Sequence, residues 1–270
     1  MATLVTEQGI VHYETYGRGR PVLLLHGWLG SWSLWRNTIE ELGKEFRTYA
    51  LDFWGFGESG DQGADFSVDN FVVLVNQFMD RLGIVKAPLV GHSMGGTVSL
   101  SAAVRHPEKV VKVIIIIGSP IVGSSLSPLL KVAAFRGWIG LGETSPRLFN
   151  LFMSGMRVSL RGYSYLLAKD GRSLGNMFAN DLSKLTVGPF FESITTLRQT
   201  DLRPRMSEVK LPVLGIYGKR DLIVNPNQYK VLKQYAPQSK IALFDGSGHF
   251  PMLDEPARFH TAVRDFLNNG

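Results

Sequence analysis

Short, continuous apolar runs recur along the chain and alternate with longer amphipathic segments. The runs are rich in Val, Ile and Leu and show no clean polar alternation, which is typical of strands buried on both faces of a sheet. They cover residues 21–25, 48–51, 88–90, 110–117, 213–217 and 241–244. We expect each run to form a strand of one central sheet.

The segments between these runs carry apolar residues at helical spacing. Residues 67–82 are the clearest case, with Ser67 as the expected N-cap and Gly83 as the stop. Residues 225–235 and 255–267 follow the same pattern. Strands that alternate with helices predict a mostly parallel α/β sheet. Residues 3–16 alternate more regularly and end at Gly17, so we expect an antiparallel hairpin at one edge of the sheet.

The alternation breaks between about residue 118 and residue 212. This stretch contains helical pieces with large apolar side chains, separated by Gly and Pro. An insertion of that length is a subdomain rather than a loop. We therefore predict a core domain formed by residues 1–120 and 206–270, interrupted by a helical cap at residues 121–205.

The net charge is concentrated in this predicted cap. The chain has 29 Lys and Arg against 23 Asp and Glu, a formal charge of +6, and residues 120–205 hold 11 of the basic and 5 of the acidic side chains. No nucleic-acid-binding motif accompanies them, so we expect no nucleic-acid partner. We favour a solvated outer face of the cap over attraction to acidic substrates or to an anionic membrane surface.

Composition removes further classes of protein. The chain has no cysteine, which excludes disulfides, zinc ribbons, iron–sulfur sites and thiol nucleophiles. The N-terminal residues lack the features of a signal peptide, and the run at 110–117 is shorter than the roughly 20 residues that span a bilayer. We expect a cytoplasmic protein with no metal and no cofactor, and no pattern indicates its oligomeric state.

The strongest chemical signal is the sequence Gly-His-Ser-Met-Gly-Gly at residues 91–96. It follows a short apolar strand and opens a helix of small residues, which is the context of a G-x-S-x-G nucleophile elbow. The tight turn requires glycines and leaves the hydroxyl of Ser93 exposed. The helix N-terminus behind it offers backbone N–H groups to a developing oxyanion.

A serine nucleophile needs a base, and the base needs an orienting carboxylate. Asp221 and His249 each follow a predicted strand, and the chain order Ser93, Asp221, His249 is the order of an α/β-hydrolase triad. The loop after the strand at 21–25 begins His-Gly-Trp. We expect the backbone N–H groups of Trp28 and Met94 to form the oxyanion hole, and His26 to hold that loop by hydrogen bonding.

These motifs identify the chain as similar to the α/β-hydrolase fold superfamily. The resemblance extends over nearly the whole length and also includes the turn at residues 52–59 and the Gly-His-Phe at residues 248–250. It implies an eight-stranded sheet with a cap inserted after the sixth strand, and the triad and oxyanion hole given above. It also suggests Trp54 as a pocket residue. We expect four aromatic residues to contact the substrate: Trp54, Phe135, Trp138 and Phe250.

Ser93 restricts the chemistry within this superfamily. Haloalkane dehalogenases and epoxide hydrolases that resemble this chain carry Asp at the elbow, so both are disfavoured. Our first interpretation is a serine carboxylesterase that acts on small to medium hydrophobic esters through an acyl-enzyme. Carbon–carbon bond hydrolases of ring-fission dienes, lactonases and perhydrolases of the cofactor-free haloperoxidase type share the triad. A ligand receptor on the same fold is the non-enzyme alternative.

Overall fold

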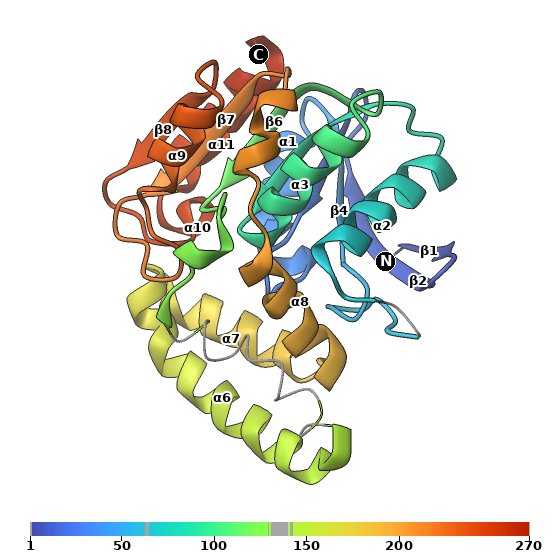
Figure 1. Ribbon diagram of the computed structural model, residues 1–270, viewed down its shortest axis with the longest axis vertical. Coiled ribbons are helices and arrows are strands. Elements are labelled where there is room, and N and C mark those ends of the chain that lie inside the picture. Colours follow the sequence, from blue (N-terminus) through green and yellow to red (C-terminus); the bar gives the residue numbers. More distant parts are fainter. Residues whose placement is uncertain (1, 63–64, 129, 131–139, 141–142, 270) are drawn as a thin grey trace.

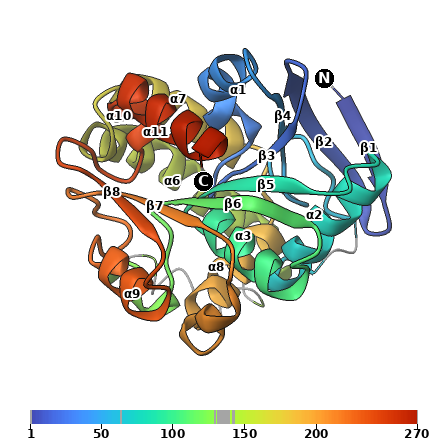
Figure 2. The same cartoon turned by 90° about the horizontal axis from the view of Figure 1, so that it is seen from above.

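The computed structural model describes residues 2–62, 65–128, 130, 140 and 143–269. A single eight-stranded sheet runs through the middle of the molecule, with helices on both faces (Figures 1 and 2). Its strands are β1 (Ala2–Thr6), β2 (Gly9–Tyr16), β3 (Pro21–Leu25), β4 (Arg47–Leu51), β5 (Ala87–His92), β6 (Val110–Ile117), β7 (Val213–Gly218) and β8 (Lys240–Phe244).

The strand order is β1-β2-β4-β3-β5-β6-β7-β8. The β1–β2 hairpin is antiparallel and joins the sheet through an antiparallel β2–β4 pair, whereas all strands from β4 to β8 are parallel. Every predicted strand run lies within an observed strand, and the hairpin lies at the sheet edge as expected. Continuous apolar runs mark the middle strands because both of their faces are covered; Val22 to Leu25 of β3, for example, are fully buried.

The helices around the sheet follow the expected alternation. On one face lie α1 (Arg36–Leu42) and α11 (Pro256–Asn269), and on the other lie α2 (Val68–Arg81), α3 (Met94–Arg105) and α9 (Gln228–Tyr235), as Figure 2 shows. The short helix α10 (Pro251–Asp254) precedes α11. The hydroxyl of Ser67 accepts a hydrogen bond from Asn70 N–H, which confirms it as the N-cap of α2.

Three of the helices that the structure describes lie between β6 and β7 in the sequence and cover one end of the sheet (Figure 1). They are α6 (Pro146–Leu167), α7 (Gly171–Leu182) and α8 (Val187–Gln199). The insertion therefore follows the sixth strand, as the family resemblance implies. After it, the 3-10 helix η3 (Arg203–Glu208) contacts α3 and α9 of the core. Two further 3-10 helices, η1 (Trp32–Trp35) and η2 (Gly123–Ser125), lie in loops.

The two ends of the insertion are held next to each other. Isolated bridges pair Val122 with Asp201 and Leu126 with Val224. The side chain of Gln228, at the start of α9, accepts hydrogen bonds from the N–H groups of Ile121 and Val122. The cap therefore leaves and re-enters the core at one fixed point. No helix in the described part of the chain is long and apolar enough to cross a membrane.

Candidate active site

Ser93 lies at the turn between β5 and α3, where it caps the helix. Its backbone has φ +53° and ψ −118°, a conformation that a residue with a side chain adopts only at an energetic cost. Its N–H donates to the carbonyl of Ile117, 2.7 Å away, which holds the turn against β6. A side chain on Gly91 would overlap the backbone of Gly95, and one on Gly95 would overlap the backbone of Leu25. The glycines are therefore required because β3, β5 and α3 meet so closely.

His249 follows β8 and forms a hydrogen-bonded pair with Asp221, which follows β7. His249 Nδ1 lies 2.7 Å from Asp221 Oδ2, and both residues are buried. The second carboxylate oxygen of Asp221 accepts from the N–H groups of Ile223, at 2.8 Å, and Val224, at 2.9 Å. Because the carboxylate is fixed in this way, the imidazole donates from Nδ1 and keeps Nε2 as an acceptor, which is the tautomer that a general base requires.

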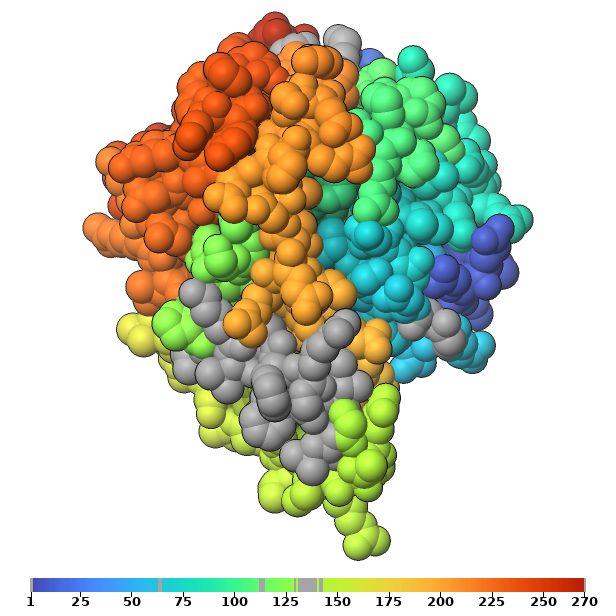
Figure 3. Space-filling model, viewed as in Figure 1, coloured from blue at the N-terminus to red at the C-terminus, as the bar shows by residue number. Residues whose placement is uncertain are grey.

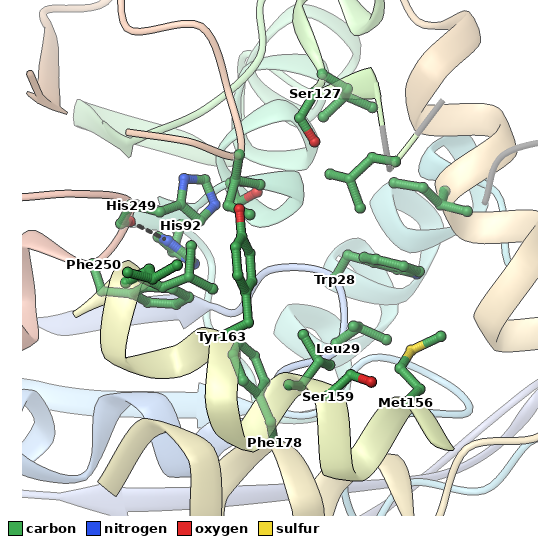
Figure 4. Close-up of a pocket in the computed structure, with 18 of the residues that line it drawn as sticks. Trp28, Leu29, His92, Ser127, Met156, Ser159, Tyr163, Phe178, His249 and Phe250 are labelled. Atoms are coloured by element: carbon green, nitrogen blue, oxygen red, sulfur yellow. Dashed lines mark hydrogen bonds between the residues drawn. The ribbon is translucent and has the colours of Figure 1, made fainter. Parts of the chain in front are cut away.

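His92, the residue before Ser93, holds the loop that carries His249. His92 Nε2 lies 2.9 Å from the carbonyl oxygen of His249, and the two rings are 4.7 Å apart (Figure 4). Burial, with a smaller contribution from the neighbouring His249, lowers the pKa of His92 well below its ordinary value. The ring is therefore neutral and donates from Nε2. The sequence had given no sign of this role.

His26 holds the loop after β3 by two hydrogen bonds. Its Nδ1 donates to the carbonyl of Gly27, 2.8 Å away, and its Nε2 accepts from Phe53 N–H at 3.0 Å. Burial lowers the pKa of His26, which agrees with a neutral ring in this tautomer. The structural role expected for His26 is confirmed. A Cβ on Gly27 would lie 3.0 Å from Ser93 Cβ, so this loop rests directly against the elbow.

The next two residues of the loop connect it to the cap and to the cavity. Trp28 donates from Nε1 to the carbonyl of Phe190 in α8, 3.0 Å away, and the two rings are 5.1 Å apart. Leu29 has φ +62° and, with Ser93, is one of two non-glycine residues with positive φ in the described chain. Strained backbone on both sides of one cavity is typical of a functional site. Met94, whose N–H we expect to complete the oxyanion hole, follows Ser93 directly and is fully buried.

A cavity of about 670 Å³ lies between the core and the cap, and Ser93 and His249 both line it. Figure 4 shows His249 among the side chains around this cavity. Most of its lining is apolar, and the described lining includes no Lys, Arg, Asp or Glu. The other lining residues are Trp28, Leu29, His92, Leu126, Ser127, Leu130, Met156, Ser159, Leu160, Gly162, Tyr163, Leu166, Leu167, Phe178, Ile194, Leu197, Ile223 and Phe250. The cavity therefore brings the Ser93 and His249 side chains to a largely apolar space.

The four aromatic residues expected to contact the substrate divide into three cases. Phe250 lines the cavity, with its ring 5.0 Å from that of His92. The expectation for Trp54 is wrong: its side chain is fully buried, does not belong to the described cavity lining and donates from Nε1 to Thr6 Oγ1, 3.1 Å away. Phe135 and Trp138 lie outside the described residues.

Two contributors to the site were missed from the sequence. Gly118, directly after β6, has φ +55°, and a Cβ there would lie 3.1 Å from His249 Nδ1 and 3.3 Å from Asp221 Oδ2. The sequence signal for it was a glycine directly after a buried strand, at the same edge of the sheet where Ser93, Asp221 and His249 follow their strands. Tyr163 extends from α6 into the cavity (Figure 4). In the sequence, Tyr163 shares one side of a helical pattern with Leu160 and Leu167. This spacing does not show what that side of the helix faces.

The described residues contain no group of three or more His, Asp or Glu side chains placed to hold a metal ion.

The sequence model of the alpha/beta hydrolase fold family matches residues 20–256 of the chain. The chain belongs to this family. The matched region begins just before β3 and ends after α10, so it includes Ser93, Asp221, His249 and the whole cap.

Relatives of this α/β-hydrolase match nearly its whole length. The pimeloyl-[acyl-carrier protein] methyl ester esterase of Vibrio campbellii is 28% identical over 269 residues, which cover 95% of this chain and 98% of that protein. Among solved structures, an esterase from Exiguobacterium antarcticum superposes with a TM-score of 0.81 at 20% identity, covering 97% and 96% of the two chains. A meta-cleavage product hydrolase from Pseudomonas fluorescens has a TM-score of 0.79 at 22% identity, covering 99% and 97%. At these identities the solved structures establish the fold.

Proposed function

We propose that this protein is a serine carboxylic ester hydrolase in which Ser93 is the nucleophile. The observation that carries the proposal is the position of the strained Ser93 elbow and the His249–Asp221 pair on one apolar cavity. A nucleophile, a base and an orienting carboxylate in this arrangement are the parts that acyl transfer through a covalent intermediate requires. The names of the full-length curated relatives support the same reaction class.

The proposed reaction has two steps. His249 Nε2 removes the proton of Ser93 Oγ as the oxygen attacks the ester carbonyl, while the N–H groups of Trp28 and Met94 bind the oxyanion. His249 then gives the proton to the departing alcohol, which leaves an acyl-Ser93 ester. Water attacks this ester with His249 again as the base, and the carboxylic acid and free Ser93 are the products. Asp221 stays ionised and stabilises the imidazolium in both steps.

The cavity supports an ester with a sizeable apolar part. Besides Ser93, its described walls combine aliphatic and aromatic side chains with three hydroxyl-bearing residues, Ser127, Ser159 and Tyr163. A carboxylate in the cavity would find no Lys or Arg in the described lining, so this part of the wall favours neutral esters over the acidic ring-fission dienes of carbon–carbon hydrolases. The methyl ester of a pimeloyl group, which the names of the curated relatives give as their substrate, is a neutral ester of this kind.

The first experiment compares the wild type with Ser93→Ala on p-nitrophenyl acetate and butyrate. We expect a burst followed by steady turnover in the wild type, and neither in the variant, because the acyl group then has no oxygen to bind. Thermal unfolding of the variant is the control for an intact fold. Turnover retained by Ser93→Ala would contradict the proposed nucleophile. A wild type that turns over a vinylogous keto acid but no ester would point to the carbon–carbon hydrolases, and ligand-induced stabilisation without turnover would point to a receptor.

A further inference from the structure

Helix α6 exposes a row of large apolar side chains on the outside of the cap. Between 47% and 73% of the surface of each is exposed: Leu148, Leu151, Phe152, Val158, Tyr165 and Leu166. With 100° between successive residues, they occupy one side of the helix, whereas Phe149 and Met153 are buried on the other. Figure 1 shows α6 at the outer edge of the cap, and Figure 3 shows its end projecting from the surface. Exposed apolar patches of this kind mark interaction surfaces.

The charges on this helix all have one sign. Helix α6 carries Arg147, Arg157 and Arg161 and has no Asp or Glu. At helical spacing, the three arginines lie along one border of the apolar row. An apolar strip bordered by arginines matches a surface with acidic groups above an apolar layer. Two copies of this face would instead bring like charges together, which disfavours a second copy of the chain.

The apolar row continues into the mouth of the active-site cavity. Gly162 and Leu166 line the cavity although both are exposed, and Leu167, the next residue, lines it from a buried position. The exposed row and the cavity wall therefore share Leu166.

We propose that the outer face of α6 docks on the anionic surface of a lipid bilayer. In this orientation the cavity wall at Leu166 faces the bilayer. The six apolar side chains enter the boundary between headgroups and acyl chains, and the arginines contact the acidic headgroups. The apolar side chains outnumber the arginines, which favours a lipid layer over an acidic protein as the occupant. Docking is a binding property of α6 and does not depend on ester hydrolysis, although it would supply lipid-dissolved esters to the proposed active site.

The test is flotation of the purified protein with vesicles of phosphatidylglycerol and phosphatidylcholine, compared with phosphatidylcholine alone. We expect binding to the anionic vesicles that weakens as salt is raised from 20 to 500 mM. Replacing Arg147 and Arg161 by Gln should lower the partition coefficient about fivefold for each arginine. Replacing Arg18 and Lys210, two exposed cations of the core domain, is the matched control and should leave the partition coefficient unchanged.

The apolar contribution is tested in the same assay with a triple variant in which Leu148, Leu151 and Val158 become Ser. It should lose most vesicle binding and keep its rate on dissolved p-nitrophenyl acetate. The control variant replaces Val5 and Val85, which are 69% and 77% exposed, and should bind as the wild type does. Ser93→Ala should also bind normally, which separates docking from catalysis. Absence of flotation at low salt, or a dimer in sedimentation velocity that the triple variant disperses, would overturn the proposal.

Discussion

At the scale of single residues, Gly118 sets the space available to the proposed base and its carboxylate. Replacing it with Ala would place a methyl group 3.1 Å from His249 Nδ1, so we expect a large loss of kcat for p-nitrophenyl butyrate. The positive φ adds about 1 kcal/mol or more to the loss of stability. Gly83 is the matched control, because its φ of +64° is similar but nothing lies within 4 Å of its Cβ position. Gly83→Ala should lose stability but keep full activity; equal activities in the two variants would contradict the prediction.

Asp221 is held by both of its oxygens, so Asp221→Asn isolates its charge from its position. The amide oxygen can still accept from Ile223 and Val224, but the NH₂ group then faces His249 Nδ1 and favours the wrong tautomer. We expect kcat to fall by roughly 10⁴-fold, as in chymotrypsin. Asp245→Asn, an exposed carboxylate on the adjacent loop, should leave the rate unchanged. A near-wild-type rate for Asp221→Asn would show that another carboxylate serves the base.

At the scale of elements, Asp181 links the cap helix α7 to the loop after β3. Its buried carboxyl accepts from Ser31 Oγ at 2.9 Å. Burial, with a smaller contribution from the Asp52 charge, raises the pKa of Asp181 to about 6, from an ordinary value of 3.8. The folded protein therefore holds this proton more tightly than the unfolded chain, and the free energy of unfolding contributed by Asp181 falls as the pH rises from about 4 to 6. The difference corresponds to at most about 3 kcal/mol.

Asp181→Asn removes this ionisation and keeps an oxygen for Ser31. We expect the variant to be more stable than the wild type at pH 7.5, by roughly 1–3 kcal/mol, and equally stable at pH 4. Urea unfolding at the two pH values measures the difference. Asp265→Asn, an exposed change in α11, should not alter the pH dependence. A variant less stable than the wild type at pH 7.5 would show that the ionised carboxylate is needed at the cap contact.

The elements that the sequence predicts well are those whose residues must satisfy several conditions at once. The middle strands appear as unbroken apolar runs because both faces are buried, and the elbow glycines appear because three elements meet there. Trp54 shows the opposite case. Its place in a family motif did not reveal whether its ring faces the cavity or the core, because that depends on Thr6 from a distant strand. The sequence also did not show which cap residues line the cavity, because this wall forms only when the cap helices pack against the core.

At the scale of the whole molecule, the cavity between core and cap should select esters by their length. Each methylene transferred from water to an apolar wall is worth about 0.8 kcal/mol, so kcat/KM should rise about fourfold per methylene until the cavity is full. The measurement is kcat/KM for p-nitrophenyl esters from acetate to decanoate. Ser127→Phe adds a ring to the wall and should move the optimum to shorter acids, while the rate on acetate, which needs little of that wall, is the internal control. A strong preference for acetate over all longer acids would contradict the hydrophobic-ester assignment, because a cavity of about 670 Å³ would then contribute nothing to recognition.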